Sequence, residues 1–115
     1  MDKDLIDYQE ELYNLTSDYK KVLFEYADIK QIYERMEDLK KVTLAKAKNA
    51  VERAQSEAAR ERIAFASDKY ITFIEDLSKI RGEYIKSQCK KDAYKNRIDA
   101  IITIISSIKE QMRLR

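Results

Sequence analysis

The chain has 115 residues, one glycine (Gly82) and no proline, and 38% of its residues are charged with a net charge of +2. Strand-rich folds need glycine, asparagine, aspartate or proline at turns roughly every dozen residues, so this composition excludes most all-β and α/β folds. It is typical of long helices and coiled coils, and its apolar fraction of 44% is too high for a disordered chain.

Chemistry-bearing residues are scarce. The chain has no histidine and one cysteine, Cys89, so zinc clusters, histidine-based triads and intrachain disulfides are excluded. A single glycine rules out a glycine-rich phosphate loop. We therefore predict no enzyme activity, no catalytic or metal-binding residues and no cofactor. No apolar run is long enough to span a membrane and the N-terminus is acidic, which predicts a cytoplasmic protein with no membrane partner.

A seven-residue repeat, with positions lettered a to g, begins at Leu5 and predicts a first helical arm over residues 3–50. Aspartates at positions 2, 4 and 7 suit the positive end of a helix dipole. The seam of a coiled coil consists of its a and d positions. In this arm they are Leu5, Tyr8, Leu12, Leu15, Tyr19, Val22, Tyr26, Ile29, Tyr33 and Met36.

Alanines replace large apolar residues over residues 42–62, where we predict that the chain reverses. Asn49 followed by Glu52 has capping-box spacing, and Ser56 is a second candidate N-cap. The alternative is one continuous helix, because alanine has the highest helix propensity of any residue.

The second arm is predicted over residues 56–113, with a register that begins at Ile63 and is out of phase with the first by two residues. Gly82 and the polar seam residues Ser87 and Lys91 weaken it, so a break near residues 86–92, giving three helices, is an alternative. Its apolar seam residues are Ile63, Ala66, Tyr70, Phe73, Leu77, Ile80, Tyr84, Tyr94, Ile98, Ile101, Ile105, Ile108 and Met112.

Further apolar residues occupy e and g positions, so the apolar face is wider than one partner helix covers. These residues are Leu23, Ile32, Leu39, Ile74, Ile102 and Ile104. We predict a single all-α domain over residues 1–115: a long antiparallel helical hairpin of coiled-coil type, completed as a bundle in a homodimer or higher oligomer. The alternative is a monomeric three-helix bundle.

Charge divides between the arms. Residues 1–38 carry 11 acidic and 5 basic residues, whereas residues 39–115 carry 10 acidic and 18 basic. An antiparallel fold would set the acidic arm beside the basic residues 79–97. Alternatively, these basic residues with interleaved Tyr84 and Tyr94 would form a nucleic-acid-binding face. The basic residues are Lys79, Arg81, Lys86, Lys90, Lys91, Lys95 and Arg97.

The closing segment, YKNRIDA at residues 94–100 leading into IISSIKEQMR at residues 104–113, resembles the C-terminus of small coiled-coil proteins from temperate phages of Gram-positive bacteria. The resemblance covers about the last 55 residues. It implies a gene from the early region of a phage, near replication, recombination or host-takeover functions, and a protein in the cytoplasm of a bacterial host.

These patterns favour a non-enzymatic coiled-coil interaction module that self-associates and binds or modulates another protein, such as phage or host DNA-processing machinery. One alternative is a sequence-nonspecific nucleic-acid-binding accessory protein that uses residues 79–97. The other is a purely structural or assembly component.

Overall fold

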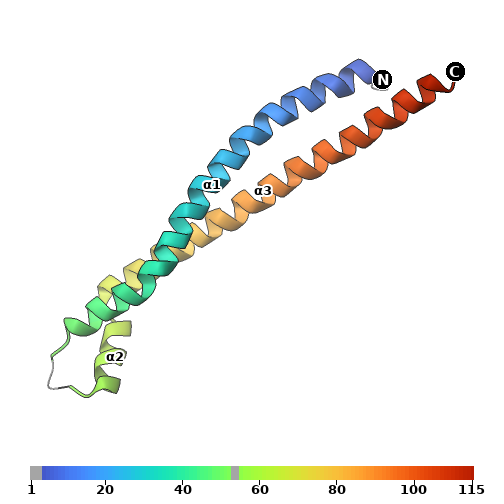
Figure 1. Cartoon of the computed structure of the whole chain (residues 1–115). Helices are drawn as coiled ribbons and strands as arrows, with labels where there is room; N and C mark the ends of the chain where they lie inside the picture. The colour runs from blue at the N-terminus through green and yellow to red at the C-terminus, as the bar shows by residue number, and fades with distance from the viewer. Residues whose placement is uncertain (1–3, 53–54) are drawn as a thin grey trace. The chain divides into compact units, whose positions relative to one another are not determined.

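The structure is a computed structural model that describes residues 4–52 and 55–115. These residues form three α-helices and no strand: α1 (Leu5–Asn49), α2 (Glu57–Phe65) and α3 (Asp68–Arg113) (Figure 1). The predicted all-α class is confirmed. The chain divides into two compact units, unit 1 (Met1–Ala27 with Lys86–Arg115) and unit 2 (Asp28–Ile85).

Within each unit, α1 and α3 run antiparallel. Residues of rising number on α1 contact residues of falling number on α3. These pairs are Glu11 with Arg97 and Glu25 with Lys90 in unit 1, and Tyr33 with Tyr84 and Glu37 with Arg81 in unit 2. The predicted helical hairpin is confirmed. The alternative of one continuous helix is wrong, because residues 50–52, 55 and 56 are not helical.

Two aspartates cap the start of α1. The Asp7 N–H donates to Oδ1 of Asp4 over 3.0 Å, and the Asp4 N–H donates to Oδ2 of Asp7 over 3.3 Å. This reciprocal pair has capping-box geometry and satisfies N–H groups that have no partner within the helix. Asp2 and the predicted first residue of the arm, residue 3, lie outside the described residues.

Ser56, and not Asn49, is the N-cap at the reversal. The Oγ of Ser56 accepts a hydrogen bond from the Ala59 N–H over 3.2 Å and starts α2. The prediction for Asn49 is wrong, because the alanine-rich segment before it keeps its helical conformation and Asn49 is the last residue of α1.

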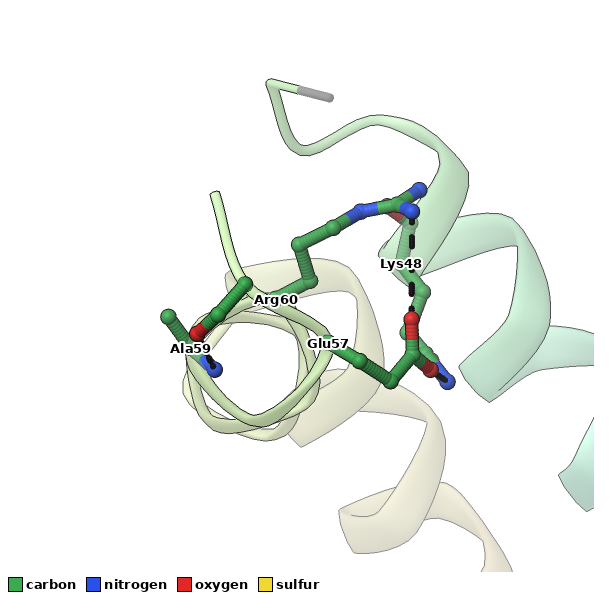
Figure 2. Close-up of polar contacts among 5 residues, drawn as sticks. Lys48, Glu57, Ala59 and Arg60 are labelled. Atoms are coloured by element: carbon green, nitrogen blue, oxygen red, sulfur yellow. Dashed lines mark hydrogen bonds and ion pairs between the residues drawn. The ribbon is translucent and has the colours of Figure 1, made fainter. Parts of the chain in front are cut away.

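Helix α2 contacts the C-terminal turn of α1 through charged side chains (Figure 2). The Arg60 guanidinium donates to the Lys48 carbonyl over 3.1 Å, and the Lys48 ammonium pairs with the Glu57 carboxylate. The last carbonyls of a helix lack partners within it. The Lys48 carbonyl accepts from the Val51 N–H over 3.1 Å, and Arg60 is its second donor. Lys48 lies near the C-terminus of α1 and Glu57 at the N-terminus of α2. Each charge is therefore opposite in sign to the partial charge at its helix end and stabilises it.

The second arm is interrupted at Ala66 and Ser67. The Ser67 hydroxyl donates to the Ala64 carbonyl over 2.7 Å and accepts from the Tyr70 N–H over 3.3 Å, so one side chain ends α2 and begins α3. This break displaces the start of the predicted register. Ile63 lies exposed on α2, and its neighbour Ala64 is buried instead. The prediction that Ile63 belongs to the seam is therefore wrong.

Helix α3 is continuous through residues 86–92, so the break predicted there is wrong. Lys91, the polar residue expected to weaken this part of the seam, is half-buried with its ammonium 4.6 Å from the centre of the Tyr26 ring. A cation over an aromatic face is an attractive contact, so Lys91 is accommodated without unwinding the helix.

The core is small. Among the described residues, the buried hydrophobic side chains are Val22, Ile101 and Ile105 in unit 1 and Ala64, Tyr70 and Leu77 in unit 2. The remaining predicted seam residues are half-buried, apart from Ile63, Ala66 and Met112, which are exposed. A hairpin with this few buried side chains gains little hydrophobic stabilisation relative to its chain entropy.

Candidate protein interaction surface

Ion pairs close one flank of the seam in unit 1. In the registers set by Leu5 and Ile63, Glu11, Glu25, Lys90 and Arg97 all occupy g positions. Arg97 donates to Oε1 of Glu11 from two nitrogens, over 2.7 and 3.0 Å. The Lys90 Nζ lies 3.9 Å from Oε2 of Glu25. Pairs of g residues meet across an antiparallel seam, so these contacts fix the orientation of the two segments.

In unit 2 the ion pair lies on the e flank. Arg81 donates to Glu37 over 2.9 Å and to the Tyr33 hydroxyl over 3.4 Å. Tyr33 is stacked on Tyr84, with ring centres 5.0 Å apart and an angle of 12° between the rings. The hydrogen bonds from Arg81 and from Tyr33 lower the pKa of the Glu37 carboxyl, and those to Tyr33 and Glu37 raise the pKa of Arg81.

Glu37 should therefore contribute to stability in a pH-dependent way. A lowered pKa in the folded state means that the contribution is present above the ordinary glutamate pKa of about 4.3, and is lost as pH falls through the lowered value. We expect Glu37→Gln to reduce the free energy of unfolding at neutral pH. This reduction should become smaller as the pH falls below the ordinary glutamate pKa and through the lowered pKa of Glu37. Urea unfolding over a pH series measures the difference.

An Arg81→Met background provides the control for this prediction. With the Arg81 guanidinium that donates to Glu37 removed, the further change Glu37→Gln should have a much smaller pH-dependent effect. An undiminished pH dependence in the Arg81→Met background would contradict the assignment of the effect to this pair.

The predicted nucleic-acid-binding face is largely engaged with α1. Arg81, Lys90 and Arg97 pair with carboxylates of the acidic arm, and Lys91 lies over Tyr26. The other three residues, Lys79, Lys86 and Lys95, are exposed. The structure thus brings most of these cations to the acidic arm, which is the first of the two arrangements that the charge pattern suggested.

The apolar residues predicted to exceed the seam are mostly exposed. Leu23, Ile32, Leu39 and Ile102 are exposed, whereas Ile74 and Ile104 are half-buried. Further exposed apolar residues, which the pattern at a, d, e and g does not include, occupy b and c positions: Ile6, Tyr13, Val42, Ile71 and Ile85. Inspection of these positions at seven-residue spacing would have found them, because they adjoin e and g on the helix surface.

Other kinds of site have little support among the described residues. No three acidic, cysteine or histidine side chains gather into a group that could hold a metal ion. Cys89 is exposed, and Glu57, whose pKa is lowered by its hydrogen bond from Lys48, is paired with that lysine. The surface that distinguishes this chain is therefore its exposed apolar one.

A search of the described helices finds none with the length and apolarity that crossing a membrane requires. Comparison of the chain with protein-family models, with curated proteins and with solved structures finds no match in any of the three.

Proposed function

We propose that this protein is a non-enzymatic helical interaction module that associates with itself and binds or modulates another protein. The observation that carries the proposal is the combination of a small core with exposed apolar residues along the flanks of the seam. Soluble proteins rarely leave large contiguous apolar surface to water unless it is an interaction site. The ion pairs of the g flank in unit 1 support the same proposal, because the exposed Ile6, Tyr13, Leu23 and Ile102 of that unit lie on the other flank.

The setting of the proposal comes from the resemblance of the closing segment to coiled-coil proteins of temperate phages. On that basis the second partner would be a phage or host DNA-processing protein, and the site of action would be the bacterial cytoplasm.

Light scattering of the purified chain at two concentrations tests self-association, and affinity capture from the native host tests the second partner. We expect a mass of at least two copies that falls on dilution, because a core this small needs further burial. A mass of one copy at every concentration would overturn self-association. A tight oligomer that retains no other protein would support the structural or assembly alternative instead.

The nucleic-acid-binding alternative ranks second, because four of its seven residues already contact α1. The informative variant is Lys79→Glu with Lys86→Glu, since these lysines are exposed and their substitution leaves the ion pairs with α1 in place. Binding of labelled single- or double-stranded DNA at low salt that is weakened by this variant and by added salt would favour the alternative.

A further inference from the structure

We infer that a second copy of this chain packs on the b and e flank of α1 in unit 1, which we call the neutral stripe: Ile6, Gln9, Tyr13, Thr16, Lys20 and Leu23. This inference rests on the proposed function and names the surface and the partner through which self-association occurs.

The neutral stripe has the composition of an interface. The side chains of Ile6 and Tyr13 are 64% and 77% exposed, and Leu23 is 38% exposed. Only Lys20 among its six residues is charged. The Thr16 hydroxyl already donates to the Leu12 carbonyl over 2.7 Å, so its proton keeps a partner when water is removed.

The opposite flank of the same unit is unsuitable for this role. There the Glu11–Arg97 and Glu25–Lys90 pairs occupy the surface, and burying them would require removing water from four charged groups. Of the two flanks of α1 in unit 1, the neutral stripe is therefore the one suited to burial against a second copy.

A shallow depression of about 390 Å³ lies at the edge of this stripe, where Ile6, Gln9 and Tyr13 of the stripe line it together with the neighbouring Glu10 and Asn14. Side chains of a packed helix insert as knobs between the side chains of its neighbour. The depression between Ile6 and Tyr13 is a place where such a side chain from the second copy fits.

The partner is a second copy because of charge. A stripe with one charge does not repel its own twofold-related copy, as a strongly charged surface would.

Paired lysine substitutions test the inference in the full chain. Ile6→Lys with Tyr13→Lys alters the neutral stripe. Phe24→Lys with Leu114→Lys is the matched control, because Phe24 and Leu114 are 64% and 76% exposed and lie off the stripe, at f and c positions of unit 1. All four side chains are exposed, so none of the substitutions removes a buried group.

In sedimentation equilibrium, we expect the stripe variant to raise the dimer dissociation constant by about 100-fold or more, since each substitution counts twice in a symmetric interface. The control should change it by less than about threefold. Far-UV circular dichroism verifies that the variants keep their helix content. If the helix content of the lysine variant falls, Ile6→Ala with Tyr13→Ala replaces it. We expect this alanine variant to weaken the dimer by about tenfold.

The outcomes separate this inference from the proposed function. A wild-type chain that is monomeric at all concentrations overturns both. A wild-type dimer that the stripe variants leave intact, or that the control weakens as much as they do, overturns the neutral stripe alone and leaves self-association standing through another surface.

Discussion

Replacing Ile101 with alanine is expected to lower the free energy of unfolding by about 3 kcal/mol. Ile101 exposes none of its surface, and unit 1 has only Val22 and Ile105 as further buried hydrophobic side chains among the described residues. Removing three carbon atoms there leaves a cavity that a core of this size has few neighbours to fill. Urea unfolding followed by far-UV circular dichroism measures the loss.

Ile85→Ala is the matched control for Ile101→Ala, because the residue type and the helix are the same and Ile85 is 51% exposed. We expect a change of less than about 1 kcal/mol, since alanine also has the higher helix propensity. Equal losses from the two variants would mean that Ile101 is not the buried seam residue that the structure places in unit 1.

Replacing Cys89 with proline is expected to lower the free energy of unfolding by about 3 kcal/mol or more. Cys89 lies within α3 at an exposed f position, so its side chain contributes little and the effect is that of the backbone. Proline removes an N–H that the helix uses, and its ring collides with the preceding turn. The loss of helical circular dichroism and the midpoint of urea unfolding both report the effect.

Cys89→Ala isolates the backbone effect, and we expect it to change stability by less than about 0.5 kcal/mol. If residues 86–92 formed a break between two helices, proline would be tolerated and the two variants would behave alike. That result would contradict the continuous α3 of the structure.

The helical pattern was predictable because it is local. Seven-residue spacing of apolar residues marked both long helices, and the observed bounds of α1, Leu5–Asn49, lie within a residue or two of the predicted range of 3–50. Capping by Asp4, Asp7 and Ser56 also depends on residues within one turn, so sequence alone could identify these caps.

The position of the break was not predictable by the same means. Gly82 and Lys91 are weak points for a helix on sequence grounds, yet glycine costs a helix only about 1 kcal/mol. Lys91 is stabilised by Tyr26, a contact between distant parts of the chain that periodicity does not reveal. The break in the second arm, at Ser67, has a local signal in its N-cap serine. Ser56 is also an N-cap serine, so serine alone does not indicate where the long helix begins.

The surface was predictable in kind but not in detail. Unequal charge on the two arms predicted that they would attract each other, and the e and g positions held an apolar surplus. Which flank keeps its apolar residues depends on where the ion pairs form, and that requires the register of α1 against α3. Glu11 with Arg97 on one flank, opposite Tyr13 on the other, became evident only in the antiparallel arrangement.

The exposed thiol at Cys89 makes the unmodified sequence convenient for spectroscopy. It is the single cysteine of the chain and points away from the seam, so a maleimide dye attaches at one known place. If the chain self-associates as proposed, mixing donor-labelled and acceptor-labelled samples would report subunit exchange through energy transfer, and the rate of exchange would give the lifetime of that oligomer without any engineered attachment site.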